Sequence, residues 1–126
     1  MRAFKNKWFY HWARKEDITD AVLLNAAEEI AAGQVEASLG GCLYKKRLPR
    51  PGQGKSGGYR VVVGYKWPND ERLIFLYAFA KSKKANMSAK EEAALSLVAE
   101  SFVSTNDKQL QDLLAAGSVR EVQHHE

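Results

Sequence analysis

The chain has 126 residues, of which 45% are hydrophobic and 27% are charged, and its formal net charge is +4. This composition is typical of one globular domain and excludes a disordered or fibrous protein. No apolar run approaches the roughly 18 residues that a membrane span needs, and residues 1–12 do not resemble a signal peptide. We therefore expect one domain over residues 1–126, in the cytoplasm and without a membrane partner.

The N-terminal third of the chain predicts one strand and two helices. A strand over residues 2–5 is expected to precede a helix over residues 7–15, in which Trp8 and Trp12 lie at helical spacing and are candidates for the core. A second helix has a broad apolar face and ends at Gly33. We expect these two helices to form a hairpin.

The middle of the chain predicts an antiparallel meander of three strands. A strand over residues 42–48 leads into residues 49–58, a segment with two prolines and four glycines that must be a loop. Strands over residues 59–67 and 72–80 follow and are joined by a turn at residues 68–70.

Alternation along these strands predicts which side chains share a face. Lys45 and Arg47 lie on one face of their strand, and Arg60 projects on the face opposite to Tyr59 and Val61. Two further sets are each expected on a single face as core packing: Tyr59, Val61, Val63 and Tyr65 in one strand, and Leu73, Phe75, Tyr77 and Phe79 in the next.

The C-terminal third predicts two more helices. Ser88 and Glu91 form a capping box, and the helix after them is expected to place on one face Ala94, Leu95, Val98, Ala99 and Phe102. A last short helix ends at Gly117, and residues 119–122 are candidates for an edge strand. The order β-α-α-β-β-β-α-α predicts an α+β fold, a small antiparallel sheet with an N-terminal helical hairpin and C-terminal helices.

The basic residues are distributed unevenly along the chain. No Asp or Glu occurs from Ala37 to Asn69, a stretch that contains Lys45, Lys46, Arg47, Arg50, Lys55, Arg60 and Lys66. Solvated surfaces normally interleave both signs of charge. The asymmetry therefore indicates a polyanionic partner, and we expect that partner to be RNA.

The glycine-rich loop carries two partial nucleotide-binding motifs. Residues 52–57 contain three glycines in GxGxxG spacing, and Lys55 follows a glycine as in a P-loop. Both motifs need a helix directly after the loop, whereas a strand follows here. A flexible hairpin loop explains the glycines but not the cations Arg50, Lys55 and Arg60, which together predict close contact with a phosphate chain.

The residue types narrow the chemistry that this segment can perform. His11, His124 and His125 are not spaced for a catalytic triad or a metal site, so we expect neither a metal nor a cofactor. RNA can be cleaved when its 2′-hydroxyl attacks the adjacent phosphate. This reaction needs a proton acceptor, a proton donor and stabilisation of the charged phosphorane. Lysines, arginines and a tyrosine can supply these functions, although residue types alone favour plain phosphate binding over catalysis.

Three stretches together resemble a known family. Their residues are Lys45-Lys46-Arg47, Gly52-x-Gly54-Lys55-Ser56-Gly57-Gly58-Tyr59-Arg60, and Phe79-Ala80-Lys81-Ser82-x-Lys84-x-Asn86-x-Ser88 before a capped helix. They resemble the RelE/HigB-like toxins of bacterial type II toxin–antitoxin systems, and the likeness covers nearly the whole chain. It implies a small RelE-type domain that enters the ribosomal A site and cuts mRNA there without a metal.

The resemblance also implies site residues. Lys45 and Arg47 match paired basic residues of the family, Arg60 matches an arginine that contacts the scissile phosphate, and Lys81 matches a basic residue after the next strand. We expect RNA or phosphate contacts from Lys46, Arg50, Lys55, Tyr59, Tyr65, Lys83 and Lys84. The family's tyrosine is replaced by Asn86 or Met87 and an arginine by Ser82, which leaves Lys83, Lys84 and Tyr65 as candidate general acids.

The leading hypothesis is thus an mRNA endonuclease toxin that a cognate antitoxin neutralises by covering the basic face of the sheet. An exposed cationic face in a cell rich in nucleic acid needs such masking. We expect the antitoxin to be a small helix-turn-helix protein. The alternatives are a non-catalytic RNA-binding or ribosome-binding module and a ParE-like toxin that poisons gyrase.

Overall fold

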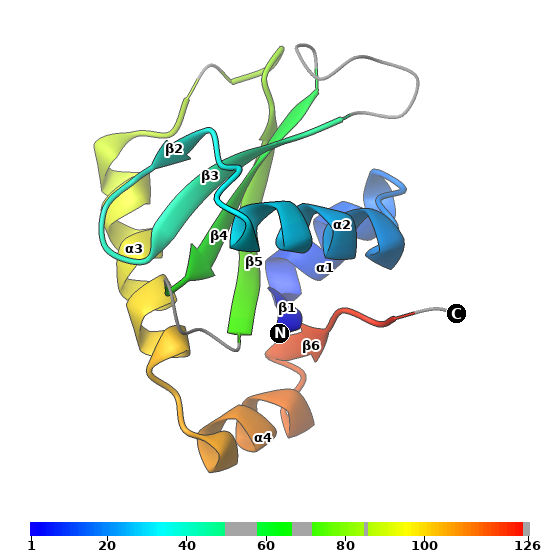
Figure 1. Cartoon of the computed structure of the whole chain (residues 1–126), viewed down its shortest axis with the longest axis vertical. Coiled ribbons are helices and arrows are strands. Elements are labelled where there is room, and N and C mark those ends of the chain that lie inside the picture. The colour runs from blue at the N-terminus through cyan, green and yellow to red at the C-terminus, as the bar shows by residue number, and fades with distance from the viewer. Residues whose placement is uncertain (50–57, 67–71, 85, 125–126) are drawn as a thin grey trace.

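The computed structural model describes residues 1–49, 58–66, 72–84 and 86–124 (Figure 1). Its strands are β1 (Arg2–Asn6), β2 (Ala37–Ser38), β3 (Leu43–Leu48), β4 (Tyr59–Tyr65), β5 (Arg72–Ala80) and β6 (Val119–Glu121). Its helices are α1 (Lys7–Lys15), α2 (Asp20–Ala31), α3 (Ala89–Val103) and α4 (Asp107–Ala115). The predicted α+β class is confirmed, as are the edge strand β6 and the capping box of α3. Strand β2 was not predicted.

The six strands form one sheet in the order β2-β3-β4-β5-β1-β6. The meander β3-β4-β5 is antiparallel, as predicted, but β1 pairs with β5 in parallel, so the prediction of an antiparallel sheet is wrong. The reason is that β1 lies inside the sheet, between β5 and β6, and buries Ala3 on one face and Phe4 on the other. An inner strand pairs with a neighbour on each side, and the local sequence of β1 does not specify which strands these are.

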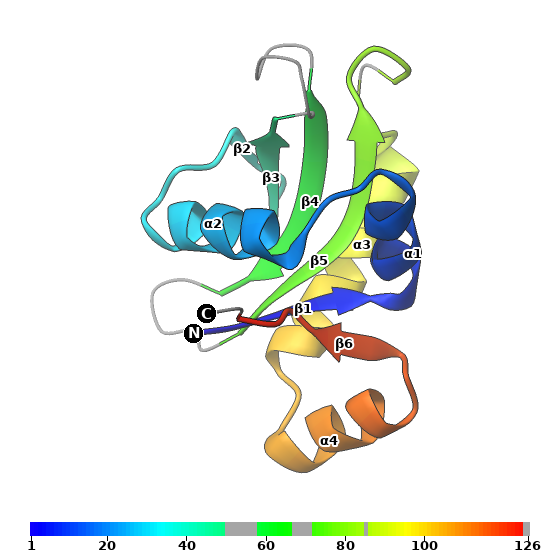
Figure 2. The same ribbon diagram turned by 90° about the vertical axis from the view of Figure 1, so that its right-hand side faces the viewer.

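Helices cover both faces of the sheet and enclose two cores (Figure 2). The first core lies between the sheet and α1 and α2, where Phe9 and Leu23 pack against Val61 and Phe75. The second core lies between the other face and α3 and α4. None of the described helices is long and apolar enough to cross a membrane.

Helices α1 and α3 bury partly different residues from those that the sequence predicted. In α1 the fully buried residue is Phe9, whose ring lies 5.2 Å from that of Phe75, whereas Trp8 is 45% exposed, so its predicted core position is wrong. Trp12 packs partly buried against the first core. In α3 the buried residues are Ala99 and Phe102, and the predicted inward positions of Ala94 and Val98 are wrong because both are exposed.

A β-bulge divides β5 between the two cores. Its register with β4 shifts at Val62 and Val63, which pair with Tyr77 and Phe75. A bulge adds one residue to a strand, so the side chains beyond it change face. Leu73 and Phe75 therefore belong to the first core, while Tyr77 and Phe79 face the second, and the prediction of a common face for these four residues is wrong.

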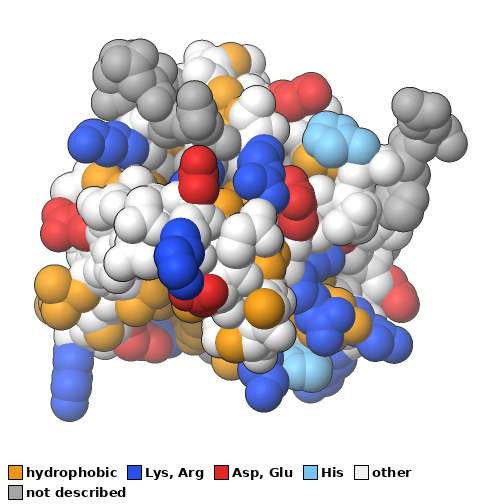
Figure 3. Space-filling model, turned by 90° about the horizontal axis from the view of Figure 1, so that it is seen from below, with side chains coloured by type: hydrophobic (Ala, Val, Ile, Leu, Met, Phe, Trp, Pro, Cys, Tyr) orange, Lys and Arg blue, Asp and Glu red, His pale blue; other side chains and the backbone are white. Residues whose placement is uncertain are grey.

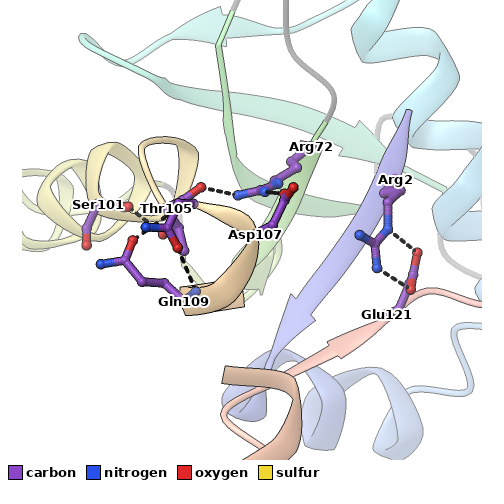
Figure 4. A network of polar contacts seen from close by, with 8 residues as sticks. Arg2, Arg72, Ser101, Thr105, Asp107, Gln109 and Glu121 are labelled. Carbon is purple, nitrogen blue, oxygen red and sulfur yellow. Dashed lines mark hydrogen bonds and ion pairs between the residues drawn. The ribbon is translucent and has the colours of Figure 1, made fainter. Parts of the chain in front are cut away.

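Polar contacts fasten α4 and β6 to the rest of the sheet (Figure 4). Arg72, the first residue of β5, donates hydrogen bonds to the carbonyl oxygen of Thr105 and, over 2.7 Å, to Asp107 at the start of α4. On the neighbouring strands Arg2 donates to both carboxylate oxygens of Glu121 over 2.9 Å. Acidic and basic side chains are interspersed over this end of the molecule (Figure 3).

Candidate functional site

Three of the predicted catalytic residues share one face of the sheet. Lys45 and Arg47 are two positions apart in β3 and therefore lie on the same face, and Arg47 lies directly opposite Arg60 of β4. Leu43, on the same face of β3, belongs to the second core, so this surface lies on the side of the sheet that faces α3 and α4. We call the surface formed by Lys45, Arg47 and Arg60 the cation face.

Of the carboxylates in the described residues, that of Glu36 lies among these cations. The Arg60 Nε atom is 3.1 Å from Glu36 Oε1 and 3.0 Å from Oε2, and Arg47 Nε is 3.3 Å from Oε1. Lys45 Nζ is 3.9 Å from Oε2. The Glu36 amide donates to the Lys45 carbonyl over 2.8 Å, which fixes this residue beside β3 just before β2. Glu36 therefore offsets one of the three positive charges on a face that the local sequence presents as purely basic.

The protonation of Glu36 reflects two opposing influences. Burial alone raises the pKa of the Glu36 carboxyl, but hydrogen bonds from Arg60 and Arg47, with the attraction of Arg60 and Lys45, outweigh burial and hold the pKa below its ordinary value. The carboxylate is consequently ionised at neutral pH. Directly opposed arginines would otherwise repel each other, so Glu36 allows both guanidinium groups to stay on one face.

The three cations differ strongly in accessibility. The Arg60 side chain is 4% exposed and that of Lys45 is 11% exposed, whereas that of Arg47 is 52% exposed. Lys45 Nζ also donates to Asn86 Oδ1 over 3.3 Å, which connects β3 to the segment that follows β5. Arg47 is thus the most accessible of the three, and Arg60 is shielded beside Glu36.

The turn after β5 brings further lysines to the same end of the sheet. The Lys81 amide donates to the carbonyl of Gly58 over 3.3 Å, directly before β4, and the side chains of Lys81 and Lys83 are exposed. Lys84 Nζ instead lies 2.6 Å from a carboxylate oxygen of Glu91. The hydrogen bond from Lys84, followed by that from the Ser88 backbone, lowers the pKa of Glu91 to about 2.

The family comparison agrees with this arrangement. The family model for the RelE toxin of the RelE/RelB toxin–antitoxin system matches residues 1–122. The chain belongs to the RelE toxin family. No curated protein and no solved structure gives a significant match. The protein is therefore a toxin of a toxin–antitoxin system, and its partner is an antitoxin.

Several residues expected to bind RNA lie elsewhere in the toxin. Lys46 is buried on the opposite face, where its Nζ atom donates to the Gln34 carbonyl over 2.8 Å and lies 3.1 Å from Glu29. Tyr59 and Tyr65 are buried in the first core. In the structure all three side chains are thus engaged in contacts within the protein. Arg50 and Lys55 lie outside the described residues.

Glu36 is the site residue of this RelE-family toxin that sequence reasoning missed. Glu36 directly precedes the acid-free stretch that begins at Ala37, so it was not counted among the residues of the basic segment. The antiparallel pairing of β2 with β3, in which Ala37 is opposite Lys45, returns it to the cations. The available signal was the short two-glycine turn after residue 39, which makes the chain double back at this point.

The arrangement suits charge stabilisation more than proton transfer. Arginine donates to carboxylates and phosphates with the same planar, paired geometry. In the cation face both arginines reach Glu36 through their Nε atoms, and the side chain of Arg47 is 52% exposed. A carboxylate with a lowered pKa is a weak proton acceptor, so we assign Glu36 to positioning the arginines.

Proposed function

We propose that this toxin is a metal-independent endoribonuclease that cleaves mRNA on the ribosome and so inhibits translation. The observation that carries the proposal is the convergence of Lys45, Arg47 and Arg60 on one carboxylate, on a face that continues to Lys81. A cluster that holds a carboxylate can hold a phosphate, because both offer paired oxygen acceptors. The family match supports a toxin that acts in this way.

The proposal gives each residue a part in the reaction. Arg47 binds the scissile phosphate and stabilises the charge that develops on it, with Lys81 at the neighbouring end of β5. Arg60 and Glu36 position Arg47, and Lys45 completes the positive surface. The 2′-oxygen bonds to phosphorus as the P–O5′ bond breaks, and solvent water takes the proton of the 2′-hydroxyl. Of the candidate acids, Tyr65 is buried in the first core and Lys84 is held by Glu91, which leaves Lys83 to protonate the departing 5′-oxygen.

The test is cleavage of an mRNA in a reconstituted translation system, with the new 5′ ends mapped. We expect cuts in translated mRNA and none in free mRNA. Arg47→Ala should lower the cleavage rate about 100-fold to 1000-fold, the usual loss when one donor to a developing charge is removed. The matched control is Lys108→Ala, which removes an exposed lysine from α4 and should leave the rate unchanged.

Binding to the ribosome separates catalysis from simple association. Loss of cleavage by Arg47→Ala with ribosome binding retained supports chemistry at this site. Translation that stops while every transcript stays intact refutes the endonuclease and indicates a non-catalytic binder. Arrest that follows DNA damage with translation unaffected indicates a gyrase poison. The further proposal that the antitoxin is a small helix-turn-helix protein is checked by reading the adjacent gene.

A further inference from the structure

Aromatic rings form a row along the edge of the sheet beside the cation face. The rings of Trp12 and Trp8 are stacked at 6.4 Å and 9°, that of Trp8 lies 4.8 Å from Tyr77, and that of Tyr77 lies 6.2 Å from Phe79. Trp8 remains 45% exposed, although Phe9 beside it is fully buried. The row therefore presents a large aromatic surface to solvent at Trp8.

This aromatic row lies where the sheet has an open edge. Strand β1 pairs with β5 only as far as Phe75, and Asn6 at its end donates to the Leu76 carbonyl over 3.0 Å. Beyond that point α1 follows β1, and its Trp8 ring lies against Tyr77. Since Tyr77 pairs with Val62, which in turn pairs with Lys45, the row meets the cation face directly.

Lysines surround the row. Lys84 Nζ lies 3.3 Å from the Tyr77 hydroxyl and 5.4 Å from the centre of its ring, and its charge is balanced by Glu91 at 2.6 Å. Lys81 and Lys83, in the same turn, are exposed. Exposed aromatic rings next to lysines are the surface that single-stranded nucleic acid recognises, because bases stack on the rings while cations hold the phosphates.

We propose that Trp8 and Tyr77 form a stacking site for an unpaired RNA base, next to the phosphate held at Arg47. This inference rests on the proposed function for its ligand, but it concerns binding and not cleavage. Tyr77 pairs with Val62, which pairs with Lys45, and Lys45 is two residues from Arg47, so Tyr77 lies about 10 Å across two strand spacings and about 7 Å along the strand from Arg47. A short stretch of RNA can span that distance.

A protein partner is the other class of occupant, and the chemistry of the surface disfavours it. The row is built from aromatic rings with lysines around it. Exposed aliphatic side chains gather elsewhere, at the groove of about 390 Å³ that contains Leu97 and Val98 of α3. A partner helix buries aliphatic side chains most readily. The aromatic row therefore fits a base better than an apolar helix.

The experiment compares a short fluorescent oligoribonucleotide with an abasic oligonucleotide that has the same phosphates. The wild-type toxin should bind the base-containing form more tightly by about 5-fold to 150-fold, the effect of one stacked base. Trp8→Ala should abolish this difference and leave the affinity for the abasic form unchanged, whereas Trp8→Phe should retain part of it. Arg47→Ala should weaken both forms equally.

Leu97→Ala is the matched control, since it removes a side chain that is 70% exposed on α3 and should leave both affinities unchanged. Equal binding of the two oligonucleotides by wild type, or an undiminished difference in Trp8→Ala, overturns the stacking site. Weaker antitoxin binding by Trp8→Ala with RNA binding intact also overturns it and makes the row a protein interface. Base-dependent binding through Trp8 without any cleavage supports the site while refuting the proposed endonuclease.

Discussion

Replacing Glu36 by glutamine should expose how much the cation face depends on its internal anion. Glutamine keeps the size of the side chain and one hydrogen-bond acceptor but removes the charge that faces Arg60, Arg47 and Lys45. Breaking a buried ion pair costs about 3–5 kcal/mol. Because Arg47 is half exposed and the amide oxygen still accepts from Arg60, we expect a loss of about 2–3 kcal/mol.

This loss should be visible in thermal unfolding followed by circular dichroism. At about 2.1 cal/mol/K for each of the 126 residues, the entropy of unfolding is about 0.26 kcal/mol/K, so Glu36→Gln should lower Tm by about 10 °C. The matched control is Glu121→Gln, because this residue is 35% exposed and its partner Arg2 is 45% exposed. An exposed pair contributes less than about 1 kcal/mol, which corresponds to a shift below about 4 °C.

The pH dependence gives the sign of the effect. The folded-state pKa of Glu36 is lowered, so its stabilisation is fully present above the unfolded pKa, about 4.3, and is lost as the pH falls through the folded pKa. The difference in Tm between wild type and Glu36→Gln should therefore be full at pH 7 and close in acid. Equal Tm values for Glu36→Gln and Glu121→Gln at pH 7, or a difference that widens in acid, would refute the reasoning.

Three further predictions concern the supports of the site. Gly64→Ala should destabilise the toxin by about 1–3 kcal/mol in denaturant unfolding, because its Cβ would lie 2.9 Å from that of Ala99 on α3; an unchanged midpoint contradicts this packing. Ser88→Ala removes the acceptor for the Glu91 amide and should cost about 1 kcal/mol in the same assay, whereas a neutral result means that the cap is dispensable. Lys84→Met should raise the Glu91 pKa from about 2 toward its ordinary value in a carboxyl NMR titration, and a midpoint that stays near 2 contradicts the assigned cause.

The sequence predicted the parts of the fold that local patterns determine. The meander β3-β4-β5 follows from alternating side chains and the turn residues between them, and the start of α3 follows from the capping box at Ser88. The parallel pairing of β1 with β5 could not be predicted in this way. Its residues carry the period of a strand, but the choice of neighbour depends on two cores that form only when the whole chain is folded.

The same division applies to the candidate site. A period of two and antiparallel pairing suffice to place Lys45, Arg47 and Arg60 on one face. Local alternation failed for Tyr77, because the bulge in β5 turns it from the first core to the second, next to Lys84. A bulge of one residue has no strong signal in a strand of valines and aromatic residues.

The stretch without Asp or Glu contains the cations of this surface but not the anion that stabilises them. Burying Arg60 to 4% exposure requires a nearby anion, and residues 37–69 cannot provide one. The two-residue strand β2 provides it by setting Glu36 beside β3. Arg60 is thus the buried partner of Glu36, and Glu36 also pairs with Arg47, which lies toward solvent.

A phosphate bound at Arg47 would supply a second anion to the cation face. Inorganic phosphate should therefore raise the Tm of Glu36→Gln, which lacks the first anion, more than the Tm of wild type or of Glu121→Gln. Equal increases in all three proteins would refute the idea that phosphate and Glu36 act on the same cations.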